Sequence, residues 1–201
     1  MNKQITYFFI LTSLLSCNKK EEKSTNISEK KVDSTVLQKA VENPIKQEQE
    51  LTYNLPQWVL NSNVIATEIL NINYKIDSRL QPAYLEEDFN GDGHLDVAFP
   101  ISETKNDKKG FAVVHGKTFE VFILGAGKMF KNALDDNQDY IDLWRINRKK
   151  ENDPGVEEET GNGENGILIL ENPSIEIDNT EVGGGQIYWN GKEYAYFHQT
   201  Y

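Results

Sequence analysis

Short apolar or alternating runs, separated by glycine, asparagine and charged residues, make up most of the chain from residue 51 onward. Runs of this length that are rich in Val, Ile, Phe and Tyr predict β-strands. Asn190-Gly191 lies between two such runs and accepts the positive φ values of a type I′ turn, so a β-hairpin is predicted most clearly there. The predicted strands cover 83–85, 95–101, 111–115, 118–124, 141–146, 166–170, 186–189 and 192–198.

Helical patterns are rare by comparison. Residues 55–60 carry a proline near their start and predict a short helix. Residues 64–76 mix the two periodicities and favour a strand, 130–134 predict a helical turn, and the charged, glycine-rich stretch 149–166 predicts a loop. We therefore predict a mainly β (β-rich α+β) fold, a mostly antiparallel twisted sheet or small sandwich with a short N-terminal helix. No internal repeat in the sequence indicates a propeller or solenoid.

The first 16 residues have the pattern of a secretory signal. Lys3 precedes an apolar run from Ile5 to Leu15, which is too short for a permanent membrane anchor. The run ends in Leu-Leu-Ser-Cys at 14–17, which resembles a bacterial lipobox, in which the cysteine becomes the new N-terminus and is acylated. Cys17 is the only cysteine, so no internal disulfide can form, and a buried structural thiol is the alternative interpretation.

Three segments follow from this pattern. Residues 1–16 are the predicted lipoprotein signal peptide, 17–50 the lipidated cysteine with a polar, flexible tether, and 51–201 a single β-rich domain. The predicted location is the bacterial cell envelope, anchored by lipid to the outer membrane. The basic and acidic residues at 19–22 resemble a surface-export signal of some lipoproteins, and an ordinary charged tether is the equal alternative.

The net charge limits the classes of molecule that the protein is expected to bind. A formal net charge of −11 argues against nucleic acid and anionic lipid, which both need clustered Lys and Arg. The expected contact with a membrane is therefore the N-terminal lipid alone.

The stretch 88–99 carries the most specific chemistry. Side-chain oxygens recur at alternate positions in Asp88, Asn90 and Asp92, and again at Asp96, while Gly93 supplies a sharp turn. His94 would add its backbone carbonyl and point its imidazole outward. Ca²⁺ takes six to eight oxygen ligands at short range, so this spacing predicts a calcium loop. A polar hairpin turn is the alternative, because Asn-Gly and Asp-Gly are also frequent in turns.

The flanking residues argue against an EF-hand. Position 12 of that loop carries a bidentate Glu, whereas this sequence has Phe99 followed by Pro100, and both flanks predict strands. The motif instead resembles the calcium loop of FG-GAP and VCBS repeats, which braces β-blades or sandwich modules. The stretch from about residue 55 to 201 also resembles a group of small bacterial envelope proteins. The matching features are 88–99, 111–114, 124–127 and 187–192. That resemblance implies an architecture and no activity.

Other candidate sites have weaker patterns. The acidic run 135–142 lacks a turn glycine and the alternate spacing, which favours a solvated loop. His94, His115 and His198 show no zinc spacing. The aromatic residues near the C-terminus favour a core role, with an exposed sugar- or protein-binding face as the alternative.

Two functions are compatible with these patterns. The first is a non-catalytic envelope lipoprotein whose calcium-braced β-domain is structural or adhesive and binds a surface glycan or protein. The alternative is an envelope enzyme, such as a glycan hydrolase, with a structural calcium. An enzyme requires converging carboxylates in a cleft away from the calcium loop.

Overall fold

The computed structural model describes residues 54–155 and 160–199. The predicted signal peptide, Cys17 and the tether 17–50 lie outside the described residues. Within the described residues, no helix is both long and apolar enough to cross a bilayer.

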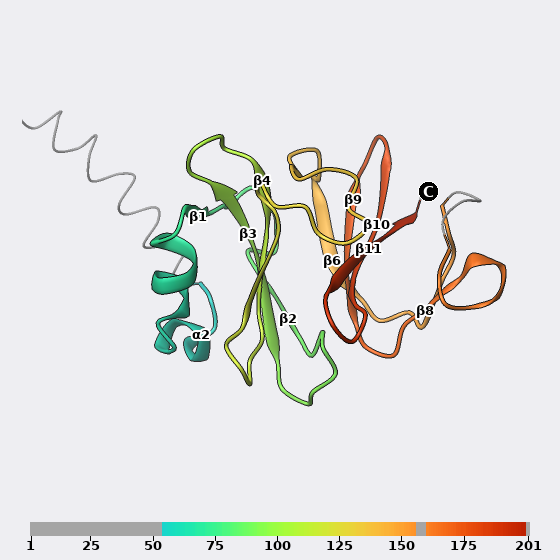
Figure 1. The fold of residues 1–201 in the computed structure, drawn as a ribbon, viewed down its shortest axis with the longest axis horizontal. Helices are drawn as coiled ribbons and strands as arrows, with labels where there is room; N and C mark the ends of the chain where they lie inside the picture. Colours follow the sequence, from blue (N-terminus) through green and yellow to red (C-terminus); the bar gives the residue numbers. More distant parts are fainter. Residues whose placement is uncertain (1–53, 156–159, 200–201) are drawn as a thin grey trace, which may run out of the picture.

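The molecule is built in layers (Figure 1). A helical layer covers one face of a five-stranded sheet, sheet A, a four-stranded sheet B packs on the other face, and a small β7–β8 ribbon lies outside sheet B. The helical layer holds α2 (Gln57–Asn61) and the π-helical turn η1 (Ile65–Leu70). The strands are β1 (Tyr74–Ile76), β2 (Leu85–Glu87), β3 (Asp96–Glu103), β4 (Lys109–Val114) and β5 (Val121–Gly125) in sheet A; β6 (Leu143–Asn147), β9 (Ser174–Asn179), β10 (Gly183–Trp189) and β11 (Tyr194–Gln199) in sheet B; and β7 (Glu151–Asn152) and β8 (Leu168–Ile169) in the ribbon, which the 3₁₀ turn η2 (Glu164–Gly166) precedes. All pairings between these strands are antiparallel.

Sheet A is apolar on both faces because both faces are covered. Phe111 points toward sheet B into the central core, whereas Phe99 and Ile101 pack against Val59 and Ile69 of the helical layer. This two-sided burial explains why β3 and β4 are nearly continuous apolar runs rather than alternating ones.

In sheet B, apolar and polar side chains alternate along the strands, so that one face is apolar and the other polar. Ile175 and Ile177 enter the core that faces sheet A. On the opposite face, Ser174 Oγ donates to Gln186 Oε1 at 2.9 Å, and Gln186 Nε2 donates to Gln199 Oε1 at 3.0 Å, in a buried polar row. The β7–β8 ribbon covers this face, and its polar groups are hydrogen-bonded to one another and to residues 152 and 153 at the ribbon.

Pro100 lies in the middle of β3 without breaking a ladder. Its carbonyl accepts the Asp77 N–H at 2.9 Å on the side of β1 and β2. Because N–H and C=O of one strand residue point the same way, the missing N–H of Pro100 faces that side too. There β2 pairs only up to Ala98 and β1 only from Ile101, so no strand partner is lost.

The predicted mainly β, antiparallel fold with a short N-terminal helix is confirmed. The strands predicted at 111–115 and 118–124 are also found, and they pair directly as the hairpin of β4 and β5. Trp144, within the strand predicted at 141–146, is buried, and its ring stacks on Phe111 at a centroid distance of 5.5 Å.

Two predictions of local structure are wrong. Residues 65–70 form η1, which buries Ile65 and Ile69 under sheet A, and only Tyr74–Ile76 of the predicted strand pairs. Residues 130–134 form no helix: Lys131 bridges to Ala195 and the chain then turns. In both places, contacts with distant residues override the local pattern.

Three further predictions need adjustment. In the hairpin of β10 and β11 the turn lies one residue later than predicted. The Asn190 N–H donates to the Glu193 carbonyl at 3.1 Å, which leaves Gly191 (φ 95°) and Lys192 at the centre of the turn. The stretch 149–166 contains β7 and η2, so it is not simply a loop. The strand predicted at 166–170 shortens to β8, in which Ile169 is exposed.

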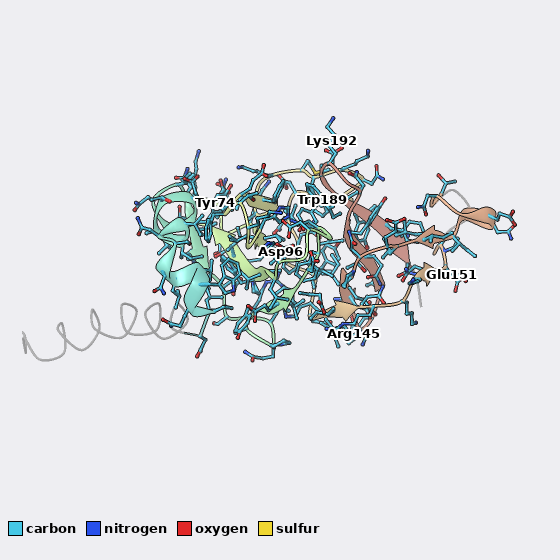
Figure 2. All side chains as sticks on the ribbon, turned by 90° about the horizontal axis from the view of Figure 1, so that it is seen from below. Tyr74, Asp96, Arg145, Glu151, Trp189 and Lys192 are labelled. Atoms are coloured by element: carbon cyan, nitrogen blue, oxygen red, sulfur yellow. The ribbon has the colours of Figure 1, made fainter. Side chains whose placement is uncertain are left out.

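The turns that form the candidate site lie together at one end of the sandwich. The loop before β3, the β4–β5 turn, the segment before β9 and the β10–β11 turn all lie at the lower edge in Figure 1. We call this edge the loop end. Figure 2 views the molecule from it, with Asp96 and Trp189 near the centre.

Candidate metal centre

The loop at residues 88–96, called the acidic loop below, connects β2 to β3 at the loop end. Two of its glycines take left-handed backbone conformations, Gly91 with φ 76° and Gly93 with φ 84°. Residues with a Cβ adopt this region at a cost of about 1–2 kcal/mol. The glycines therefore allow the sharp turn that the sequence predicts.

Asp88 holds the first half of the acidic loop together. The backbone N–H groups of Gly91 and Asp92 donate to its Oδ1 at 2.8 and 3.1 Å. The N–H of Gly93 donates to its Oδ2 at 2.9 Å. One carboxylate thus satisfies three consecutive backbone donors, as expected for an acid at the first position of a tight turn.

The next two oxygen-bearing residues repeat the arrangement on a smaller scale. Asn90 Oδ1 accepts the Asp92 N–H, and Asp92 Oδ1 accepts the His94 N–H, both at 2.9 Å. The His94 side chain is exposed, as predicted. Alternate side-chain oxygens therefore point inward along the loop, and the imidazole points away from it.

Asp96 is the buried member of the set. Its Oδ2 accepts the N–H groups of Phe89 and Asn90 at 3.0 and 3.2 Å, and its Oδ1 accepts the Gly116 N–H at 3.0 Å. Burial raises the pKa of the Asp96 carboxyl to about 6, against the opposing effect of these three hydrogen bonds, and the nearby Asp88 carboxylate adds to the rise.

Gly116 joins the β4–β5 turn to the acidic loop. A Cβ on Gly116 would lie 1.9 Å from the Leu95 carbonyl oxygen, so only glycine allows this approach. The sequence gives no sign of this contact, because Leu95 and Asp96 are distant from Gly116 along the chain.

A buried pair, His115 and Tyr194, lies behind the loop. His115 Nε2 and Tyr194 Oη are 3.0 Å apart. Burial lowers the pKa of His115, against the opposing effect of Glu120 and the loop acids, and burial raises the pKa of Tyr194 well above its usual value, with Asp96 and Asp88 adding to the rise. Both groups are therefore neutral near pH 7. His115 is thus both hydrogen-bonded and buried.

The acidic loop is not a preassembled metal cage. Among the described residues, no three Asp, Glu, His or Cys side chains converge on one point. The hydrogen bonds give the reason, because the loop acids are turned onto the loop's own N–H groups. A calcium ion would therefore have to draw these oxygens toward one another.

The donor set nevertheless fits Ca²⁺ by chemistry. Each side-chain oxygen accepts about two hydrogen bonds, and Asp88 Oδ2, Asn90 Oδ1, both oxygens of Asp92 and Asp96 Oδ1 accept one or none. Within the described residues, no Lys or Arg forms an ion pair with these acids. Four hard-oxygen residues with free lone pairs and uncompensated charge match the ligands that calcium prefers.

The second acidic run, 135–142, behaves differently. Asp136 forms an ion pair with Lys108, and Asp142 accepts the N–H and hydroxyl of Thr180. Two of its acids therefore have partners elsewhere in the chain, whereas the acids of the acidic loop bond mainly to the loop itself.

A groove of about 650 Å³ adjoins the acidic loop. Its walls come from Asn90 and Gly91, from segments 160–162 and 168–172, and from the end of β10 with its turn. Of the C-terminal aromatic residues, Tyr194, Tyr196 and Phe197 are buried in the core, as favoured, while Tyr188 and Trp189 are half-buried and line the groove.

Comparisons of the chain with protein-family models, with curated proteins and with solved structures find no match. The candidate site therefore rests on its own geometry.

Proposed function

We propose that this protein is a lipid-anchored protein of the bacterial cell envelope, whose β-domain is braced by one calcium ion and acts as a non-catalytic binding or adhesion module. Asp88, Asn90, Asp92 and Asp96 would bind the ion through side-chain oxygens, and His94 through its carbonyl. Cys17 would carry the lipid. The observation that carries the proposal is the set of alternate oxygens in a loop whose three carboxylates have no basic partner within the described residues.

Calcium would act here as a structural brace. The acidic loop joins β2 to β3, and through Gly116 it also holds the β4–β5 turn. Neutralising three clustered carboxylates would relieve their mutual repulsion at the point where these two connections meet.

The groove supports binding over hydrolysis. Glycoside hydrolysis requires two carboxyl groups that face each other across the sugar. Along the described wall of the groove there is one, Glu171. A smaller hollow of about 190 Å³ is lined by Glu151, Asp153 and Glu176, but Arg145 pairs with Glu176, and the volume is below the usual range for substrate pockets.

Thermal unfolding tests the proposal. The protein is the chain from residue 17 with Cys17→Ser, compared in millimolar calcium and in chelator. Extracellular calcium modules bind with Kd of about 0.1–1 mM, and a tenfold excess of ion over Kd adds about 1.4 kcal/mol to the free energy of unfolding. We expect a higher Tm in calcium and no such rise in Asp92→Ala.

Asp139→Ala serves as the matched control, because Asp139 is an exposed acid of the second acidic run. It should keep the full calcium response. An unchanged Tm in calcium, together with no calcium bound in a titration, would sink the proposal.

A further inference from the structure

The groove beside the acidic loop has the size of a ligand site. Its volume of about 650 Å³ lies within the usual range of 300–1,000 Å³ for small-molecule pockets. It lies at the loop end, where the acidic loop, the segments 160–162 and 168–172 and the last residues of β10 with its turn form the walls.

The charge of the groove selects against ionic ligands. Its described lining contains no Lys, Arg or His, and its one carboxylate is Glu171. An anionic ligand would find no counter-charge, and the protein as a whole carries a formal net charge of −11. A single exposed acid is also a poor site for a polycation. This described lining suits a neutral, polar ligand.

The polar groups on the walls are mainly amides. Asn172 makes no side-chain hydrogen bond within the described residues, and Asn90 and Asn190 each use their oxygen in a turn while the amide nitrogen keeps its donors. An amide can donate and accept at once, which suits hydroxyl groups that also do both.

Two aromatic rings stand beside these amides. The ring of Trp189 is held by edge contacts with Phe122 and Tyr194 at centroid distances of 5.3 and 5.1 Å, and Tyr188 packs on the ribbon. Both are half-buried, so each presents part of a rigid ring to the groove. Rigid aromatic side chains offer contact area at a low entropic cost.

The acidic loop and the groove share one contact. The side chain of Asn172 occupies the space where a Cβ of Gly91 would stand, with its Oδ1 2.4 Å and its Nδ2 2.6 Å from that point. The loop backbone therefore sets the position of the freest amide in the groove. An ion that fixes the loop would also fix this wall.

We propose that the groove binds a neutral saccharide, with Asn172 and Asn90 bonding its hydroxyls, Tyr188 and Trp189 covering its apolar C–H faces, and affinity that rises when calcium orders the loop. The calcium dependence rests on the proposed function above, whereas the saccharide site itself does not.

Affinity electrophoresis tests the site. The chain from residue 17 with Cys17→Ser is run through gels that contain laminarin, dextran, galactomannan or xylan, with anionic alginate as the charge control. We expect retardation by at least one neutral polysaccharide and none by alginate. Asn172→Ala, and Tyr188→Leu, which keeps an apolar side chain against the ribbon, should each weaken retention about tenfold, the usual weight of one good polar or aromatic contact. Asn106→Ala removes an exposed amide at the opposite end of β3 and should leave retention unchanged.

The outcomes separate the two proposals. Retention that is lost in Asn172→Ala and weakened by chelator supports both the site and its coupling to calcium. The same retention with no calcium effect on retention or Tm supports the site and overturns the brace. A calcium-dependent Tm without retention by any neutral polysaccharide overturns the saccharide site, leaves the brace standing and points to a polypeptide as the occupant. Retention that survives both variants, or that alginate equals, also overturns the site.

Discussion

Acidic side chains gather toward both ends of β3, and the two groups differ in the kind of partner that their carboxylates bind. Beside the second half of the strand and in the turn that follows it, Asp77 and Asp107 belong to a paired cluster with Lys75, Arg79 and Lys109. At its start, the acids of the acidic loop have only backbone N–H groups as partners among the described residues.

The pKa values of aspartates at the two ends are shifted in opposite directions. Hydrogen bonds from Lys109 and Lys75 lower the pKa of Asp107, whereas burial raises the pKa of Asp96 to about 6. Backbone donors order a carboxylate but bring no positive charge. The difference teaches that each acid of the paired cluster has a basic partner, while the acids of the acidic loop are held by backbone groups and have no counter-charge within the described residues. A cation is the partner that would remove this asymmetry.

The largest expected effect comes from removing the buried acid. Asp96→Ala leaves the Asn90 and Gly116 N–H groups without their acceptor, and each buried unsatisfied donor costs about 1–3 kcal/mol. We expect the free energy of unfolding to fall by about 4 kcal/mol in chemical denaturation. Asp107→Ala, at the exposed paired cluster, should leave the midpoint nearly unchanged. Equal losses at the two ends would contradict the comparison.

The next effect is a pH dependence of the calcium-free protein. The folded-state pKa of Asp96, about 6, lies above its usual value of 3.8, so between these values the folded state binds more protons than the unfolded state. This contribution is therefore fully present below about pH 4 and is lost as pH rises through 6. It amounts to about 3 kcal/mol, since one pKa unit corresponds to about 1.4 kcal/mol.

Denaturation in chelator from pH 4 to 7 measures this effect as the difference between wild type and Asp96→Asn, in which the group no longer titrates. Acids distant from Asp96 titrate equally in both proteins and cancel, so the difference reports Asp96 together with the Asp88 carboxylate that interacts with it. If the free energy of unfolding changes with pH by the same amount in the two proteins, Asp96 has its ordinary pKa.

Much of this loop was predictable, because its pattern is local. The alternate spacing of Asp88, Asn90 and Asp92 fixes which oxygens point inward, and the hairpins follow from apolar runs with turn residues between them. What the sequence does not show is which distant residues meet. The bond from Gly116 to Asp96 and the contact of Asn172 with Gly91 exist only after the sheets have packed.

The errors have the same origin. Residues 64–76 carry both helical and strand periodicities. Burial of Ile65 and Ile69 against sheet A, rather than local propensity, decides that residues 65–70 form η1. Likewise, the buried polar row of sheet B resembles an exposed strand face in sequence. It is buried because the ribbon, which arrives from 151–169, covers it.

Arg79→Ala tests the paired cluster of Asp77 and Asp107 with its basic partners. The Arg79 guanidinium donates to the Ile141 carbonyl and to the Gln138 carbonyl, the latter at 3.0 Å, and its Nε lies 3.3 Å from Asp77 Oδ2. Loss of these contacts should lower the free energy of unfolding by about 2 kcal/mol. Denaturation in calcium and in chelator should give the same loss, because this cluster needs no metal. A loss that depends on calcium would contradict the separation of the two ends.

The smallest effect concerns the two loop glycines, which form a matched pair. Gly91→Ala and Gly93→Ala place a Cβ in the same left-handed region, at about 1–2 kcal/mol each. The new methyl group at Gly93 meets nothing within 4 Å, whereas the one at Gly91 displaces the Asn172 amide. The atoms met at Gly91 belong to the end of the Asn172 side chain, which can move aside, so similar losses of stability are expected for the two variants in denaturation in chelator.

The two variants should differ in the groove alone. Gly91→Ala moves the amide that we assign to saccharide hydroxyls, so its retention on neutral polysaccharide should fall further than that of Gly93→Ala. Because both glycines belong to the acidic loop, damage to ion binding is common to the pair and cancels in the comparison. Equal retention would mean that the acidic loop does not position the groove through Asn172, and the contact between the two regions would then be packing without consequence for binding.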